Sequence, residues 1–341
     1  MENKREYDLC SLGEVMLRLS PQGNERIERC STLEKTAGGA ELNVCAGVSQ
    51  LGLRSGIISK VPDNGIGSYV RNQARSTGVS DDYLISDPNP KSRLGVYYYE
   101  GAAFPRKPSV IYDRDGSAIN TLKVEELPDD LFEKARMFHT SGITLALSDT
   151  LRETAIEMMR RFKEAGALIS FDVNFRGNLW TGAEAKKCIE SILPLVDLFF
   201  CSDETARLTF GKSGESRQIM KSFTEEYPIC VVASTKRTVH SPKRHSFTSV
   251  IYDRGSDTFY EEEPYRDIEV VDRIGSGDAY VAGMLYGYLK YGDCRKALEF
   301  GNALSAIKNT IPGDMTTSSR EEVEAVIEDH QHGGAGLEMK R

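Results

Sequence analysis

Short apolar runs alternate along most of the chain with longer segments in which apolar residues recur at helical spacing. The runs typical of buried strands are 8–13, 55–61, 137–143, 167–173, 197–202 and 229–234. Helical spacing predicts helices at about 40–51, 64–77, 150–165, 182–193, 203–210, 215–226, 276–291, 294–309 and 319–329. Alternation of this kind predicts an α/β protein with a mostly parallel sheet between two layers of helices.

Two stretches, 15–35 and 93–119, interrupt this alternation with extended segments punctuated by Gly and Pro. Inserted β segments often form a lid over the crevice at the carboxyl ends of the strands, where open sheets bind ligands. Residues 331–341 are polar and Gly-rich, which is typical of a flexible tail. Because no repeat or low-complexity linker divides the chain, we expect one domain over 1–330 with a small β-sheet lid.

Composition narrows the classes of function. The net charge of −8 over 341 residues argues against nucleic-acid binding, which needs a basic surface. No apolar run reaches the length of a membrane span, and the N-terminus lacks an apolar signal core. The seven cysteines are scattered without a C-x-x-C pair, as in a reduced, cytoplasmic protein.

The stretch "VVDRIGSGDAYVAGM" (270–284) places Asp278 directly behind Gly275, Ser276 and Gly277 at the predicted start of a helix. Free N–H groups and the positive end of the helix dipole favour anions at such a position. Asp278 is then either a first-turn acid that stabilises the helix, or a general base beside an anion hole. The chain has no G-x-x-x-x-G-K-[ST] loop, no protein-kinase signature set and no G-x-G-x-x-G after its first strand.

A second glycine motif, "AGGAELNVCAGVSQLG", lies at 37–52. Gly38 and Gly39 permit close backbone approach to a ligand, and Asn43 can both donate and accept hydrogen bonds. The same letters also suit a helix start with a polar first turn.

With these two glycine motifs in this order, the chain resembles the ribokinase-like (PfkB) carbohydrate kinases over about 8–330. The resemblance implies the three-layer ribokinase-like fold, with a mostly parallel central sheet, flanking helices and a small β-sheet lid. It also implies ATP-dependent phosphorylation of a sugar hydroxyl, with Asp278 as general base and Gly275, Ser276 and Gly277 as the anion hole. The implied cofactors are ATP and Mg²⁺; no metal ligand is identified, and a monovalent cation is left open.

The lid segments bear on the choice of sugar. Alternation along a strand puts Tyr97 and Tyr99 on one face of "GVYYYEG", and Tyr112 and Arg114 on one face of "VIYDRDGSA". Arg176 follows the run 167–173 in "SFDVNFRGNLW", at the carboxyl end of a strand. Two arginines that converge on one crevice suit a carboxylate and hence a sugar acid. The alternative is that the tyrosines only pack and the arginines are solvated.

Within the family, "GGAELN", Y-x-R-x-G-S-A, "SGI", "DVNFR" and a late "GD" look most like the 2-keto-3-deoxygluconate kinases. That likeness implies transfer of the γ-phosphate of ATP to the C6 hydroxyl of 2-keto-3-deoxygluconate. The implied substrate contacts are Gly38, Gly39, Asn43, Tyr97, Tyr112, Arg114, Ile143, Arg176, Asp278 and Asp314. The predicted ATP contacts are Ser202, Ser234, Thr235, Lys236, Gly275, Gly277 and Asn302.

Three segments depart from the family pattern. Ser202-Asp203-Glu204-Thr205 stands for Asn-x-x-Glu, the T-x-G-x-x-G segment has lost its glycines at 233–246, and Asp272-Arg273-Ile274 replaces Asp-Thr-Thr. Two alternatives therefore stay open: another sugar kinase of the family, for fructose, ribose or a nucleoside, and a sugar-acid sensor that has lost catalysis. The expected partners are the sugar acid, ATP and a second copy paired through the lid. The sequence leaves open whether the acid belongs to the gluconate or the galactonate series.

Overall fold

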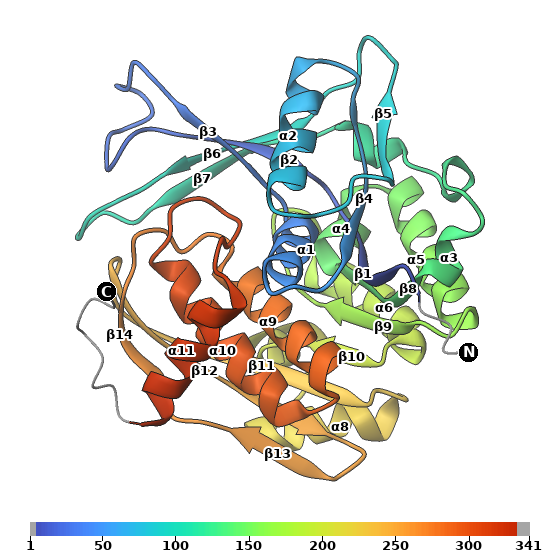
Figure 1. Cartoon of the computed structure of the whole chain (residues 1–341), viewed down its shortest axis with the longest axis vertical. Coiled ribbons are helices and arrows are strands. Elements are labelled where there is room, and N and C mark those ends of the chain that lie inside the picture. Colours follow the sequence, from blue (N-terminus) through green and yellow to red (C-terminus); the bar gives the residue numbers. More distant parts are fainter. Residues whose placement is uncertain (1–4, 333–341) are drawn as a thin grey trace.

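The computed structural model describes residues 5–332 (Figure 1). Apart from its first two positions, the predicted tail 331–341 lies outside the described residues. A ten-stranded sheet crosses the molecule in the order β13-β12-β11-β10-β9-β8-β1-β4-β5, with β14 paired to β12. Its parallel strands are β1 (Tyr7–Leu12), β4 (Ser55–Pro62), β5 (Leu84–Asp87), β8 (Ala135–Ser141), β9 (Leu168–Asp172), β10 (Leu198–Phe200) and β11 (Val231–Ser241). Its antiparallel edge consists of β12 (Arg244–Asp253), β13 (Thr258–Glu261) and β14 (Tyr265–Glu269).

The six predicted strands are all present, with two corrections. The run 137–143 stops at Ser141, whose side chain caps the short helix α4 (Gly142–Leu147). The run 229–234 continues to Ser241, because β12 pairs with its polar second half in an antiparallel hairpin. The antiparallel edge was not predicted, since these strands alternate polar and apolar residues without a long apolar run.

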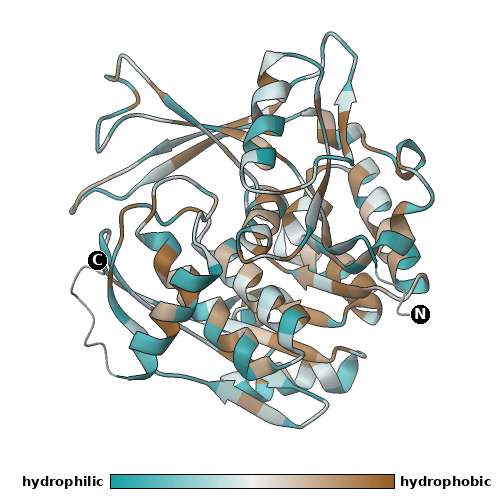
Figure 2. Cartoon of the chain, viewed as in Figure 1, coloured by the Kyte–Doolittle hydropathy of each residue, from teal (hydrophilic) through white to brown (hydrophobic). Residues whose placement is uncertain are grey.

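Helices cover both faces of the large sheet. In chain order they are α1 (Ala40–Gln50), α2 (Gly65–Ser76), α3 (Leu131–Lys134), α4, α5 (Asp149–Glu164), α6 (Gly182–Ile192), α7 (Asp203–Phe210), α8 (Ser216–Glu226), α9 (Ser276–Tyr291), α10 (Cys294–Asn309) and α11 (Arg320–Gln331). The nine predicted helices are confirmed to within one or two residues at each end. Hydrophobic residues gather on the faces turned toward the sheet (Figure 2).

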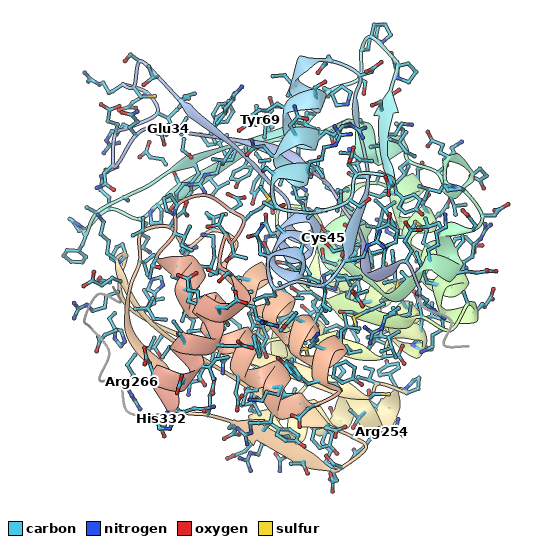
Figure 3. All side chains as sticks on the ribbon, in the orientation of Figure 1. Glu34, Cys45, Tyr69, Arg254, Arg266 and His332 are labelled. Atoms are coloured by element: carbon cyan, nitrogen blue, oxygen red, sulfur yellow. The ribbon has the colours of Figure 1, made fainter. Side chains whose placement is uncertain are left out.

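The strand period of two explains why both faces are buried. Leu198 and Phe200 belong to the apolar cluster with α9 and α10, whereas Phe199 between them packs with α8 on the other face. Side chains of the central strands therefore pack in two hydrophobic cores, one on each face of the sheet. This gives the three-layer α/β architecture that the pattern predicted. Among the labelled side chains, Cys45 of α1 lies near the centre of the view, and Arg254 and Arg266 lie at its periphery (Figure 3).

A second sheet of four strands projects from the body (Figure 1). Its order is β3 (Glu34–Gly38), β2 (Met16–Ser20), β6 (Gly95–Glu100) and β7 (Ser109–Asp113). We call it the small sheet; β2, β6 and β7 come from the two segments that interrupted the sequence pattern, whereas β3 begins at the end of the first segment and continues past it. Among residues 5–332, no helix has both the length and the apolar character that a membrane span requires.

Candidate active site

A cavity of about 290 Å³, which we call the central cavity, lies between the strand ends of the large sheet and the small sheet. It collects predicted residues from six separate parts of the chain. Those that line it are Gly39, Asn43, Tyr97, Tyr112, Arg114, Ile143, Arg176, Gly275, Ser276, Gly277, Asp278 and Asp314. Gly38 lies just behind this wall, where an added Cβ would be 2.0 Å from a carboxylate oxygen of Asp314.

Asp278 occupies the first turn of α9, as predicted, and the turn before it requires glycine. Gly275 has φ +79°, and a Cβ there would lie 1.9 Å from the carbonyl oxygen of Asp314. Asn43 Nδ2 donates a hydrogen bond to Asp278 Oδ2 at 2.7 Å. Asn43 Oδ1 is buried without a partner among the described residues, so it can accept a hydrogen bond from a ligand.

Burial sets the protonation of two carboxyl groups in this cavity. It raises the pKa of Asp278 to about 6, against the hydrogen bond from Asn43 and the charge of Arg176, which lower it. Burial, with the charge of Asp278, raises the pKa of Asp172 to about 7. Asp278 is therefore mainly ionised at neutral pH, which is the state that accepts a proton.

The structure changes the interpretation of Arg114. Its Nε donates to Glu14 Oε2 at 2.8 Å, and its Nη2 donates to the same oxygen. Ser117 Oγ donates to the other carboxylate oxygen of Glu14. Arg114 thus lines the cavity as half of a buried ion pair rather than as a free cation, and its Nη1 has no hydrogen-bond partner within residues 5–332.

Three other arginines of the cavity form no ion pair at 4.0 Å or less within residues 5–332. Arg176 is exposed and donates to the carbonyl oxygens of Phe175 at 3.1 Å and Asn174 at 3.5 Å. Arg237 and Arg273 also line the cavity, and neither forms an ion pair within the part of the chain that the structure describes. Sequence reasoning assigned no role to Arg273, whereas Arg237 was a candidate for contact with the ATP phosphates. The signal for Arg237 was strand alternation, since Ala233, Thr235 and Arg237 share the site-facing side of β11.

Asp314 joins the small sheet to the opposite wall. Arg18 Nη1 contacts Asp314 Oδ1 at 2.9 Å and Asp272 Oδ2 at 2.7 Å, and Tyr97 OH donates to Asp314. All four side chains are buried. The sequence did not predict the contacts of Arg18 with Asp272 and Asp314. Arg18 and Asp314 are 296 residues apart along the chain, so no local pattern connects them.

Glu41 is a further buried acid that the sequence did not single out. It accepts hydrogen bonds from Ser141 Oγ at 2.6 Å and Thr144 Oγ1 at 2.8 Å, and it lines the central cavity. Burial raises the pKa of its carboxyl group. In the sequence it had the appearance of an ordinary acid in the first turn of a helix.

A second cavity of about 230 Å³ adjoins the first and shares Asp172, Asn174, Arg176 and Gly277 with it. Of the predicted ATP contacts, Ser202, Thr235 and Gly277 line it. A Cβ on Gly277 would meet no atom within 4 Å, so this glycine is not required by packing. Its lack of a side chain leaves the start of α9 open to a phosphate, which fits ATP.

Gly275 lines the central cavity, but the structure does not bring the remaining predicted ATP contacts, Ser234, Lys236 and Asn302, into either cavity. Ser234 and Lys236 alternate with Thr235 and project from the other side of β11, where Ser234 Oγ donates to Asp203 at 3.1 Å. Asn302 is fully buried in α10; it donates to Glu262 at 2.6 Å and accepts from Ser249 at 2.7 Å. Its amide is therefore already satisfied inside the protein.

No group of three or more His, Cys, Asp or Glu side chains within residues 5–332 could hold a metal ion by itself. Mg²⁺ is commonly held by one or two carboxylates together with phosphate oxygens and water. Asp172 lines both cavities and offers one such carboxylate. The residues therefore fit Mg²⁺ that arrives with a nucleotide.

Comparison with known proteins identifies the family of the chain. The model of the pfkB family of carbohydrate kinases matches residues 7–321. The chain is 35% identical over 331 residues to the 2-dehydro-3-deoxygalactonokinase of Haloferax volcanii, covering 97% of this chain and 99% of that protein. It is 29% identical over 319 residues to the 2-dehydro-3-deoxygluconokinase of Bacillus subtilis, covering 91% and 92%. The crystal structure of 2-dehydro-3-deoxygluconokinase from Thermotoga maritima superposes with a TM-score of 0.89 at 33% identity, covering 94% of this chain and 98% of that one.

Proposed function

The chain belongs to the pfkB family of carbohydrate kinases, and we propose that it transfers the γ-phosphoryl group of ATP to the C6 hydroxyl of 2-keto-3-deoxygluconate. One observation carries the proposal: Asp278, the open start of α9 and three arginines that form no ion pair within residues 5–332 line a single cavity. A base and an anion site suit phosphoryl transfer, and guanidinium groups that form no ion pair can bind the carboxylate of an acidic sugar. The names of the similar enzymes, which refer to keto-deoxy sugar acids, support the choice of acid.

In the proposed reaction, Asp278 takes the proton of the C6 hydroxyl. The sugar oxygen forms a bond to the γ-phosphorus, the bond from that phosphorus to the β–γ bridging oxygen breaks, and ADP leaves. Asn43 holds Asp278 in place, and its free Oδ1 accepts from a sugar hydroxyl. The N–H groups of residues 275–277 donate to the phosphoryl oxygens. Mg²⁺, which Asp172 would hold, supplies charge that neutralises the phosphates.

We assign the sugar carboxylate to Arg114, through its Nη1, and to Arg176. Glu14 balances the charge of Arg114, so Arg114 contributes directed hydrogen bonds while Arg176 contributes net charge. Arg237 and Arg273 add positive charge for the phosphoryl group. Arg273 precedes the anion hole by two residues, and Arg237 stands where the family pattern has a glycine-rich segment.

The test is ADP release in an enzyme-linked assay with Mg-ATP and a panel of acceptors: 2-keto-3-deoxygluconate, its galactonate epimer, gluconate, fructose, ribose and adenosine. We expect turnover on the keto-deoxy acids, and the ratio of the two epimers assigns the series. Turnover confined to a neutral acceptor would contradict the carboxylate assignment. Binding of the acid without ADP release would identify a sensor.

We also propose that a second copy of the chain covers the small sheet. All five residues of β7 are exposed, and Ile111 is 54% exposed, which leaves an apolar strand at the edge of a sheet. Ile111→Glu is expected to convert a dimer into a monomer in size-exclusion chromatography with light scattering. Val239→Glu is the matched control, because Val239 is equally exposed on β11. A wild-type monomer at micromolar concentration would refute the pairing.

A further inference from the structure

Lys308, in the last turn of α10, is fully buried, which is rare for a lysine. Its Nζ donates to the main-chain carbonyl oxygens of Ile311 at 3.0 Å and Asp272 at 3.2 Å. Within residues 5–332 it forms no ion pair at 4.0 Å or less. A buried ammonium that faces carbonyl oxygens instead of a carboxylate needs an explanation beyond helix stability.

The two carbonyl oxygens belong to the segments that carry the chemistry. Asp272 opens the segment 272–278, which contains the anion hole and Asp278, and Ile311 opens the segment 311–314, which ends at Asp314. We call residues 272–278 together with 308–314 the site floor. Lys308 is therefore a cation at the junction of the two halves of the floor.

Other contacts show how closely the two halves depend on each other. Asp272 Oδ2 accepts from the N–H of Gly313 at 3.1 Å, and its Oδ1 accepts from the N–H of Ile274 at 3.0 Å. Gly275 approaches the carbonyl oxygen of Asp314 so closely that no side chain fits. A shift at this junction would therefore move the anion hole relative to Asp314.

The junction is also unbalanced in charge. Two cations, Arg18 and Lys308, face three carboxylates, Asp272, Asp314 and Asp278. The ionised carboxylates favour the protonated state of Lys308, whereas burial lowers its pKa. The charge of Lys308 in turn lowers the pKa of Asp278. Loss of this lysine would leave excess negative charge under the base.

We propose that Lys308 is a positioning residue whose ammonium group acts as a built-in cation between the two halves of the site floor, so that turnover needs no free monovalent cation. The inference rests on the proposed function. Main-chain carbonyl oxygens also take the place of water around K⁺, so a free ion can occupy the space that Lys308 would vacate. This proposal addresses the monovalent cation that the sequence left open.

The experiment compares turnover in choline, sodium and potassium chloride at equal ionic strength. Wild-type rates are expected to agree within about twofold, because only general screening changes. Lys308→Met is expected to lose about a hundredfold in choline, as small misplacements of reacting groups do, and to regain activity with K⁺ or NH₄⁺. In Lys308→Met, the rise of kcat/KM with pH is expected to shift to higher pH, because the positive charge that lowered the pKa of Asp278 has been removed. Lys296→Met, an exposed lysine of the same helix, stays at the wild-type rate.

Three results would overturn the inference. One is activation of the wild type by K⁺ of more than about tenfold over choline, which would show that a free ion is bound. Another is a wild-type rate for Lys308→Met in choline. The third is a loss that neither ion restores and that leaves the pH limb unchanged, since a merely structural role predicts that pattern. If circular dichroism shows that Lys308→Met does not fold, Lys308→Gln replaces it. If neither variant folds, the comparison of the wild type in choline and potassium chloride decides alone.

Failure of the proposed function is separable from failure of this inference. If the wild type turns over none of the acceptors, Mg-ATP binding is measured by calorimetry. Lys308→Met should then bind Mg-ATP more weakly in choline, and K⁺ should restore the affinity. Equal affinity of both proteins in choline would refute the role of Lys308 whatever the acceptor is.

Discussion

The two walls of the central cavity are built on different physical plans. The site floor is closed upon itself: its buried charges and main-chain groups bond to one another, and glycine is required where the halves touch. The small sheet reaches the cavity with Tyr97, Tyr112 and Arg114, while its outer strand is exposed along its whole length. We therefore expect substitutions in the site floor mainly to lower kcat, and substitutions in the small sheet mainly to alter KM and substrate choice.

The walls meet at one buried group of charges. Arg18 of β2 bonds to Asp272 and Asp314 of the floor, and Tyr97 of β6 donates to Asp314. Arg18 also lies over the ring of Tyr99 at 4.4 Å. We therefore expect residues of this contact to affect both kcat and KM.

The largest effect is expected in the floor. Asp278→Asn removes the proton acceptor and should lower kcat by about 10³-fold, within the range for loss of a general base. KM should change little, because Asn keeps the shape of the side chain. Asp149→Asn, at the exposed first turn of α5, is the matched control. Steady-state kinetics decide; a variant within tenfold of the wild type would exclude Asp278 as the base.

The next effect tests the small sheet. Arg114→Met alone would leave the buried charge of Glu14 without a partner, which is expected to lower the free energy of unfolding by about 3–5 kcal/mol. The double variant Glu14→Gln/Arg114→Met avoids that charge and should lower kcat/KM for the acid by about 10- to 100-fold, mainly through KM. Any slow turnover of a neutral sugar should stay unchanged. Equal losses on acid and neutral acceptors would remove the distinction between the two walls.

Tyr97→Phe tests the contact between the walls. It removes the hydrogen bond to Asp314 but leaves the ion pair with Arg18, so we expect a loss of about three- to tenfold in kcat/KM, shared between kcat and KM. Tyr98→Phe is the control, because alternation along β6 puts Tyr98 on the face opposite to Tyr97. An effect confined to KM would place Tyr97 wholly with the small sheet.

The smallest effect is a shift in the pH profile. Because only ionised Asp278 accepts a proton, kcat/KM should rise with pH through a midpoint near the pKa of about 6. Asn43→Ala removes a hydrogen bond that lowers this pKa, so its midpoint should move upward. Since ATP titrates identically with both proteins, the difference between their profiles isolates the carboxyl group. An unchanged midpoint would mean that another group controls the acid limb.

The sequence predicted the layers of the fold because periodicity is local, and it located Asp278 because a glycine turn and a helix start are local as well. It could not predict that Glu14 neutralises Arg114, since the two are 100 residues apart and neither carries a signal of the other. It also treated 234–236 as contiguous contacts. The pairing of β11 with β12 extends the strand, and alternation then leaves Thr235 and Arg237 on the site. Lys308 had the appearance of an ordinary helix residue until tertiary structure buried it.

We propose that this cavity phosphorylates a keto-deoxy sugar acid at its terminal hydroxyl. The most direct test is ³¹P and ¹H NMR of a reaction that contains the wild-type protein, Mg-ATP and 2-keto-3-deoxygluconate. We expect one phosphate monoester, whose phosphorus couples to the two C6 protons and which forms in the same amount as ADP. A phosphate on another oxygen, or ATP and acid that remain unchanged, would contradict it.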